Sequence, residues 1–201
     1  MHKYLLMYVD VIRHGATSST QGLRFNDHEH EPLAEEALVS LARIDFDASK
    51  YDRVDVSSLR RAVQTAEGLG LTGFTLDARL AERGLGIFRG LTAAQCLERH
   101  REDFERFNVF EADYRIPGGE SRGAHLARVL SWLDDVRASG AKHALAIAHG
   151  GVLDFLRRLG SGAPIHGGAF NGGALLALSR FETVGPRLRL LGFAEPLTAN
   201  P

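Results

Sequence analysis

Short apolar runs alternate with amphipathic stretches along the chain. The runs of strand length cover residues 5–13, 53–57, 74–77, 143–148, 173–179 and 187–193. Stretches with helical periodicity lie at about 34–43, 60–69, 92–107, 121–138 and 150–159. Strands that alternate with helices are typical of α/β proteins with a mostly parallel sheet. We therefore expect a three-layer α/β fold, with helices on both faces of a mostly parallel central sheet, in a single domain over residues 1–201.

Two of these segments carry additional signals. Residues 143–148, HALAIA, are almost continuously apolar, which is typical of a central strand covered on both faces. The stretch 92–107 begins with Thr92 and Gln95, the spacing of a capping box at the start of a helix. We expect 143–148 at the centre of the sheet and one helix over 92–107.

Two carboxylates interrupt the apolar runs. Asp10 lies within 5–13 and Asp55 within 53–57. A buried carboxylate needs hydrogen-bonding or charged partners because burial removes its hydration. Asp10 could alternatively lie at an exposed edge of the sheet.

Three of the predicted strands end in polar side chains. The first run ends at Arg13 and His14, the second ends at Ser57 and Ser58, and the fourth ends at His149. Arg61 lies in the first turn of the helix that follows the second run. Because ligands bind at the carboxyl ends of the strands in open α/β sheets, these side chains should face one crevice. Helix N-termini at the same edge favour an anion, and arginine donors match phosphate oxygens. Each side chain alone would more often be solvated or structural, but together they favour a phosphoryl site.

Composition restricts the partners of this site. The formal net charge is −1, so broad affinity for nucleic acid or an anionic membrane is not expected, and any anion site must be local. Cys96 is the single cysteine, which excludes an internal disulfide and fits a reducing compartment. The N-terminal apolar run is too short for a signal peptide or a membrane span. We expect a cytoplasmic protein that binds a small phosphorylated substrate, and the sequence does not indicate an oligomeric state.

Five sequence blocks resemble one family. They are RHGAT at 13–17, SSLRRAVQTA at 57–66, LAERGLGIFRGLT at 80–92, PGGES at 117–121 and AHGGV at 148–152. In this order they resemble the histidine phosphatase superfamily, the phosphoglycerate-mutase-like proteins, over about residues 5–180. The resemblance implies a phosphoglycerate-mutase-like fold.

The resemblance also implies a mechanism without a metal or other cofactor. In the family, the first histidine attacks phosphorus and forms a phosphohistidine, and here that residue is His14. Arg13, Arg61 and His149 would hold the phosphoryl oxygens. Glu82 would protonate the leaving oxygen and later activate water. A backbone acceptor on the other ring nitrogen of His14 would fix the tautomer that attacks.

The chain departs from the family pattern beside this site. Thr20 stands where the family often has an asparagine that contacts the phosphate, and its side chain is shorter. We still assign Thr20 to phosphate binding. In the loop that follows, Arg24, Asn26 and His28 could contact the substrate.

The same loop supports a rival hypothesis. The side chains of DHEHE, residues 27–31, are types that bind divalent metals, and alternate positions in a strand would place its two histidines on one face. A metal-dependent hydrolase would follow from that arrangement. We favour a polar loop at the rim of the phosphate site and predict no metal.

The segment after Glu82 bears on the reaction. Family mutases are usually longer, with an inserted arm that carries paired arginines. Between Glu82 and Gly118 this chain has no adjacent arginine pair, and Leu85 and Ala93 replace a tyrosine and a lysine of the mutases. We therefore predict a phosphomonoesterase of the histidine acid phosphatase type acting on a small organic phosphate. A cofactor-dependent phosphoglycerate mutase and a degenerate phosphate-binding module are the alternatives, and intact His14 and Glu82 argue against the binding module.

We expect a lid over about 99–116. Its aromatic residues are Phe104, Phe107, Phe110 and Tyr114. They could face an organic substrate, although the helical spacing of Phe104 and Phe107 favours packing against the core.

Overall fold

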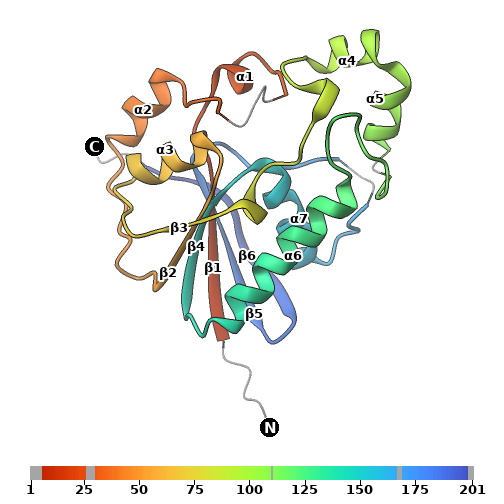
Figure 1. Cartoon of the computed structure of the whole chain (residues 1–201). Helices are drawn as coiled ribbons and strands as arrows, with labels where there is room; N and C mark the ends of the chain where they lie inside the picture. Colours follow the sequence, from red (N-terminus) through yellow and green to blue (C-terminus); the bar gives the residue numbers. More distant parts are fainter. Residues whose placement is uncertain (1–5, 26–29, 110, 167–168, 199–201) are drawn as a thin grey trace.

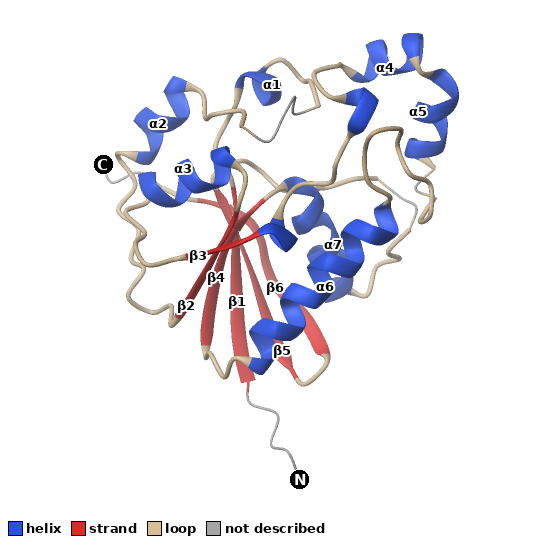
Figure 2. Cartoon of the chain, in the orientation of Figure 1, coloured by secondary structure: helices blue, strands red, loops and turns tan. Residues whose placement is uncertain are grey.

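A six-stranded sheet forms the centre of the molecule in the computed structural model, which describes residues 6–25, 30–109, 111–166 and 169–198 (Figures 1 and 2). The strands are β1 (Leu6–Arg13), β2 (Arg53–Ser57), β3 (Thr75–Asp77), β4 (His143–Ala148), β5 (Ala177–Val184) and β6 (Arg187–Pro196). Their order is β3-β2-β4-β1-β5-β6. The first four strands of this order pair in parallel, and β5 is antiparallel to both neighbours. The prediction of a mostly parallel sheet is confirmed.

Helices cover both faces of the sheet. They are α1 (Ser18–Gln21), α2 (Glu35–Leu41), α3 (Arg60–Gly68), α4 (Ala93–Arg99), α5 (Arg101–Asn108), α6 (Arg122–Ala138) and α7 (Gly150–Ser161), with short 3₁₀ turns η1 (Ala78–Leu80) and η2 (Gly86–Phe88). On one face, Leu145 and Ile147 of β4 pack in a cluster with residues of α2 and α3. On the other face, Ala144, Ala146 and Ala148 pack in a cluster with residues of α6 and α7. The three-layer α/β fold follows from this alternation along β4.

The predicted helix over 92–107 is wrong as one element. The chain leaves helical geometry at His100, with φ −139° and ψ 48°, so that α4 and α5 are separate helices. The amide of His100 still donates to Cys96 O at 2.8 Å, and Phe104 N donates to His100 O at 2.8 Å. Cys96 of α4 and Phe104 of α5 pack in one apolar cluster, so the two helices on either side of the bend share a core.

The predicted strand over 173–179 is also displaced. The strand β5 begins at Ala177 and continues to Val184. Gly173 and Leu176 both have positive φ, at 71° and 48°, and the amide of Leu176 donates to Arg13 O at 3.1 Å. Because positive φ is incompatible with a strand, the apolar start of this run forms a loop beside the end of β1. The polar alternation of residues 180–184 concealed the true strand.

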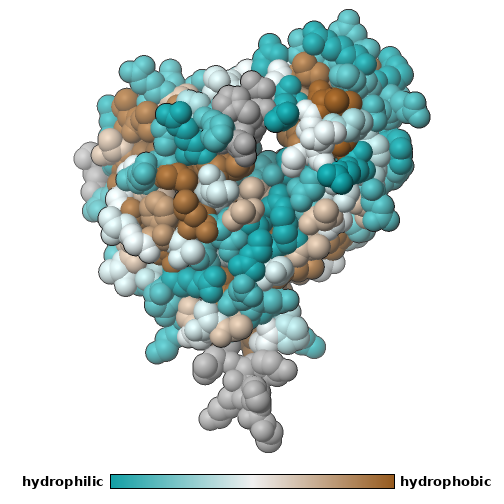
Figure 3. Space-filling model, viewed as in Figure 1, coloured by the Kyte–Doolittle hydropathy of each residue, from teal (hydrophilic) through white to brown (hydrophobic). Residues whose placement is uncertain are grey.

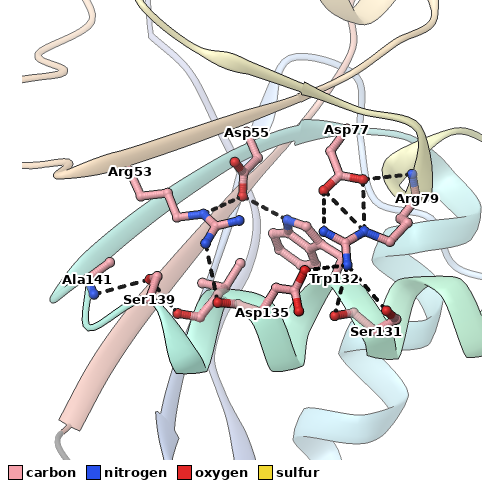
Figure 4. A network of polar contacts seen from close by, with 10 residues as sticks. Arg53, Asp55, Asp77, Arg79, Ser131, Trp132, Asp135, Ser139 and Ala141 are labelled. Atoms are coloured by element: carbon pink, nitrogen blue, oxygen red, sulfur yellow. Dashed lines mark hydrogen bonds and ion pairs between the residues drawn. The ribbon is translucent and has the colours of Figure 1, made fainter.

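Asp55 is buried with partners on α6 and β2 (Figure 4). Its Oδ2 accepts hydrogen bonds from Arg53 Nε at 2.8 Å and Trp132 Nε1 at 2.9 Å. Beside it, Arg79 joins Asp77, the last residue of β3, to Asp135 of α6. These bonds attach α6 to the β2–β3 side of the sheet. The two hydrogen bonds to Asp55 replace those to water that its carboxylate loses on burial.

Asp10 is 3% exposed, so the alternative of an exposed sheet edge is wrong. Its carboxylate accepts from Tyr51 Oη at 2.7 Å and Arg180 Nε at 3.1 Å. Lys50 Nζ lies 3.5 Å from the same carboxylate. Asp10 therefore joins β1 to β5 and to the loop before β2.

The carboxyl ends of β1, β2 and β4 point toward the end of the molecule where α1, α4 and α5 lie (Figure 1). There α4, α5 and the following loop pack around a separate apolar cluster of Phe88, Cys96, Phe104, Tyr114 and Ile116. The segment 99–116 thus lies over the edge where a ligand was expected, and its opening as a lid remains a prediction. Among the described residues, no helix combines the length and apolarity needed to cross a membrane.

Candidate active site

His14 follows the end of β1 and is 1% exposed. Its backbone N–H donates to Ala148 O at 3.0 Å, which fixes it beside the end of β4. Its ring Nδ1 lies 2.7 Å from Gly15 O. A carbonyl can only accept, so Nδ1 carries the proton and Nε2 keeps its lone pair. The backbone acceptor that the proposed chemistry requires is therefore present.

The surroundings of His14 keep its ring neutral. Burial, together with the positive charges of Arg61 and Arg13, lowers the pKa of His14 to about 3. Burial disfavours the imidazolium because a charged ring loses more hydration than a neutral one. At neutral pH the ring is thus unprotonated, and its Nε2 lone pair is free of a proton.

Two arginines supply the cationic side of the site. The guanidinium of Arg13 donates to Gly173 O at 2.6 Å, and Arg61 is 2% exposed near the start of α3. Burial lowers the pKa of both arginines, while the carboxylate of Glu82 raises them. A buried and a half-buried guanidinium group, with one half-buried carboxylate nearby, form a site that an anion would stabilise.

The loop after β1 is tied to α3. Gly15 N donates to Thr65 Oγ1 at 3.1 Å, and Thr65 Oγ1 donates to Arg61 O at 2.7 Å. This hydrogen-bonded link joins the RHGAT block at 13–17 to the SSLRRAVQTA block at 57–66 and fixes the distance between them.

His149 follows the end of β4, and its ring lies next to the ring of His14. Its ring centroid lies 5.0 Å from that of His14, and its Nε2 lies 2.8 Å from Ser57 Oγ. Leu59 N donates to the Ser57 hydroxyl, so the hydroxyl proton is available to His149 Nε2. Burial lowers the pKa of His149, and Nδ1 is buried without a partner among the described residues. In this tautomer Nδ1–H is a donor for a phosphoryl oxygen.

Glu82 is held at the start of α7. Its Oε2 accepts from Gly151 N at 3.0 Å, and its Oε1 accepts from Arg83 N at 2.9 Å. A Cβ on Gly151 would lie 2.2 Å from Glu82 Oε1. The close approach of the carboxylate to α7 therefore requires glycine at this position.

Arg128 of α6 supports the loop that carries Glu82, and the sequence analysis missed it. Its guanidinium donates to the carbonyls of Arg79, Ala81 and Glu82 at 2.6 to 3.1 Å, and to both oxygens of Glu120 at 2.9 Å. The only sequence signal was its position seven residues after the PGGES block.

His125 was also missed, and Ser57 was noted only as the polar end of its strand. His125 is 1% exposed, its ring donates to Ala81 O, and its Nε2 has no partner among the described residues. A Cβ on Gly151 would lie 2.8 Å from His125 Cε1, so the ring is next to Glu82. Burial lowers the pKa of His125 well below its usual value, so Nε2 is an acceptor in the cavity. A histidine within an amphipathic helix gave no signal for this position, whereas the polar end of β2 pointed to Ser57 but not to its contact with His149.

The predicted substrate contacts divide into described and undescribed residues. The hydroxyl of Thr20 forms a capping box with Thr17 at the start of α1, donating to Thr17 O at 2.9 Å. Arg24 donates to Gly90 O and Gln95 Oε1. Both side chains line the cavity described below, and their binding roles remain predictions. Asn26 and His28 lie outside the described residues.

A cavity of about 450 Å³ opens beside the arginines and Glu82. The polar part of its lining consists of Arg13, Thr20, Arg24, Glu82, Arg83, Asn108, Arg122 and His125. The larger apolar side chains are Phe25, Leu85, Phe104, Phe107, Phe155 and Phe170. Figure 3 shows hydrophobic surface gathered around α4 and α5 next to a hollow. Phe104 and Phe107 therefore both pack in the cluster and line the cavity, and a volume of this size holds a small organic ligand.

The metal hypothesis finds no support in the part of the chain that the structure describes, which contains no group of three potential ligands. Glu31, the last residue of DHEHE, is buried and accepts from Ser19 N at 2.9 Å and Ser18 Oγ at 3.2 Å. Residues 27–29 lie outside the described residues.

Residues 9–195 match the model of the histidine phosphatase superfamily (branch 1). The chain belongs to this superfamily.

Relatives agree with this assignment. The protein named "Putative phosphoserine phosphatase 2" from Hydrogenobacter thermophilus is 34% identical over 131 residues, which is 63% of this chain and 64% of that protein. The chain thus aligns with less than two thirds of this curated relative. Bacillus stearothermophilus YhfR has a TM-score of 0.80 at 22% identity, covering 94% of this chain and 97% of that one. The α-ribazole phosphatase of Shigella flexneri has a TM-score of 0.77 at 20% identity, covering 97% and 100%. These structures share the phosphoglycerate-mutase-like fold.

Gly151→Ala should displace the Glu82 carboxylate, because the new Cβ would occupy its place. If Glu82 is the acid and base, turnover of 4-nitrophenyl phosphate should fall by roughly 10²- to 10⁴-fold, while inorganic phosphate still binds. Gly84→Ala is the matched control, since its nearest neighbours would lie at 3.5 Å. Equal activities of the two variants would contradict this role of Gly151.

The buried His14 should make folding stability depend on pH. The unfolded chain binds a proton on this histidine below about pH 6.5, whereas the folded chain leaves it neutral to about pH 3. The unfolded state binds more protons in this window, so His14 destabilises the fold as pH falls, by about 1.4 kcal/mol per pH unit. His14→Asn, whose amide can still donate to Gly15 O, should lose less stability than wild type between pH 6 and pH 4 in urea denaturation. Parallel stability curves would rule out the low pKa.

Proposed function

We propose that the protein is a metal-independent phosphomonoesterase that acts through a phosphohistidine at His14 on a small organic phosphate. The neutral tautomer of His14 carries the proposal. Its Nδ1 proton is held by Gly15 O, while burial and the two neighbouring arginines oppose protonation of Nε2.

In the first step His14 Nε2 attacks phosphorus and the ester P–O bond breaks. The leaving alkoxide takes a proton from Glu82, which enters this step as the neutral acid. The developing positive charge on the His14 ring is balanced by the phosphoryl group itself and by the hydrogen bond from Nδ1 to Gly15 O.

In the second step water replaces the histidine. The Glu82 carboxylate takes a proton from the water as its oxygen attacks phosphorus, and the N–P bond breaks. His14 returns to its neutral form and inorganic phosphate leaves. The backbone donors of Gly151 and Arg83 hold the carboxylate in one place for both steps.

Arg13, Arg61 and the Nδ1–H of His149 supply the positive potential for the phosphoryl oxygens. Arg61 and His149 are buried and Arg13 is half-buried and held by Gly173 O, so these donors need little reorganisation as charge develops in the transition state. This arrangement removes the requirement for a metal ion at the phosphoryl group.

Hydrolysis is favoured over a mutase reaction by the contents of the segment between Glu82 and Gly118. Its arginines at 99, 101, 106 and 115 are not adjacent, and Arg106 is engaged by Glu111. A paired-arginine arm like that of the mutases is lacking in the sequence of this segment. Phosphatases among the named relatives are consistent with the same choice.

The central prediction concerns the phosphoenzyme. Wild type incubated with a ³²P-labelled phosphomonoester and quenched in alkali should carry an acid-labile label. His14→Ala should carry none, and its hydrolysis of 4-nitrophenyl phosphate should fall by at least roughly 10³-fold because the nucleophile is gone. Inorganic phosphate release and labelling are the two measurements.

His143→Ala is the matched control, since His143 lies at the opposite end of β4 against Tyr8. It should keep both label and turnover, and excess chelator should leave the wild-type rate unchanged. A wild type with neither label nor turnover between acidic and neutral pH would refute the enzyme. Loss of turnover in chelator would favour a metal-dependent hydrolase instead.

A further inference from the structure

The water that cleaves the phosphohistidine carries two hydrogens, and Glu82 takes only one of them. The other hydrogen stays on the oxygen that joins phosphorus. In a site shielded from solvent this O–H needs an acceptor, because an unpaired donor loses its hydrogen bond to bulk water. The acceptor also turns the water so that a lone pair, and not a hydrogen, faces phosphorus. A residue with this role must lie beside Glu82 and have a lone pair to offer.

Few of the polar side chains that line the cavity can accept a hydrogen bond. Four of them are arginines, which only donate. The hydroxyl of Thr20 is engaged with the backbone of Thr17 at the start of α1. Each carboxylate oxygen of Glu82 already accepts a backbone N–H. The remaining candidates are Asn108 of α5 and His125 of α6.

His125 is next to the Glu82 carboxylate. A Cβ on Gly151 would lie 2.2 Å from Glu82 Oε1 and 2.8 Å from His125 Cε1, so both side chains approach the same backbone position at the start of α7. Cε1 is the ring carbon bonded to Nε2, which brings this nitrogen close to the carboxylate. This adjacency favours His125 over Asn108.

The ring of His125 is held with Nε2 unpaired. Its other nitrogen, Nδ1, donates to the carbonyl of Ala81, the residue before Glu82. The ring of Phe155 packs against it, with centroids 5.0 Å apart and planes at 70°. Nε2 is buried and has no partner among the described residues. Buried nitrogens are seldom left unpaired, and a hydrogen of a bound water would satisfy this one.

The surroundings of His125 keep its Nε2 lone pair available. Burial, followed by the positive charges of Arg128 and two further arginines, lowers the pKa of His125 well below its usual value. The ring is therefore neutral at neutral pH, and with its proton on Nδ1 it can only accept at Nε2. It accepts a hydrogen bond without taking the proton, so it does not compete with Glu82 as the base.

We propose that His125 orients the attacking water by accepting its second hydrogen at Nε2. This inference rests on the proposed function and adds a residue to its second step. The water oxygen forms a bond to phosphorus as the P–N bond breaks, and the electron pair of that bond returns to His14 Nε2. Glu82 takes one hydrogen as a proton. The other stays on the oxygen, which leaves as part of inorganic phosphate.

His125 should therefore matter for water and not for an alcohol. In methanol a methyl group replaces the second hydrogen, so Glu82 alone satisfies the attacking O–H. The first step makes the same smaller demand, because the leaving oxygen carries the carbon of the substrate and receives one proton. Removal of the acceptor should slow the second step with water selectively.

His125→Leu removes the acceptor and keeps an apolar side chain. With ³²P-labelled 4-nitrophenyl phosphate in rapid-quench experiments, its phosphoenzyme should form at the wild-type rate and decay in water roughly 10-fold more slowly, the effect of one lost hydrogen bond. With methanol added, the share of label released as methyl phosphate should rise by a similar factor. His125→Gln, whose amide oxygen can accept, should recover part of the decay rate. Rates and shares report active molecules only, so partial misfolding does not alter them.

Two control variants separate the acceptor from packing. Phe155→Leu loosens the packing of the His125 ring and keeps its nitrogen. His143→Leu makes the same exchange of side chains at the opposite end of β4. Both should divide the phosphoryl group between water and methanol as wild type does.

The outcomes distinguish this inference from the proposed function. Equal slowing of formation and decay in His125→Leu would mean that the ring only supports Glu82, and would overturn the role in orienting water. An equal share of methyl phosphate in wild type and His125→Leu, zero included, would overturn it as well. Both results leave the phosphohistidine mechanism standing. Absence of a phosphoenzyme in wild type would overturn the proposed function and this inference with it.

Discussion

The chemistry of the site depends on the hydrogen bond from His14 Nδ1 to Gly15 O. This bond selects the tautomer, and burial between two arginines keeps the other nitrogen unprotonated. A histidine next to phosphate-binding cations faces two conflicting demands, since the site must be positive and the nucleophile must be neutral. In the proposed mechanism the two arginines meet both demands, because they would attract the phosphoryl group and they lower the pKa of the ring.

The fold brings the remaining groups to His14 through short, rigid links. The amide of His14 is bonded to the end of β4, and Gly15 is bonded through Thr65 to α3. Glu82 reaches the site on a loop held by Arg128 and docks on α7 only because residue 151 is glycine. Segments far apart in the sequence are thus fixed relative to one another by hydrogen bonds that each include a backbone atom, and a change at one link should alter the geometry of the whole site.

Most of the sheet and the inner part of the site could be predicted from the sequence. The continuous apolar pattern of β4 identified a central strand, and the polar residues after β1 and β4 identified the edge that holds Arg13, His14 and His149. These signals are local, so one sequence is enough to find them. Placing Glu82 needed the family resemblance, since an acid next to an arginine in a loop has no periodic pattern.

The elements and site residues that the sequence did not predict depend on contacts between distant segments or on unusual backbone angles. The break at His100 depends on packing of α4 and α5 around one cluster, and the late start of β5 depends on positive φ at Gly173 and Leu176. Arg128 and His125 lie on an amphipathic helix where their polarity is expected at the surface. Their roles come from contacts with residues about 45 positions earlier, which no local pattern contains.

The protonation state of His14 is the most direct test of this account. In ¹⁵N NMR of the ring nitrogens, assigned by comparison with His14→Asn, the free protein should show His14 with a proton on Nδ1 and none on Nε2 from pH 7 down to pH 5. A proton on Nε2 in that range, or a doubly protonated ring at pH 6, would contradict it.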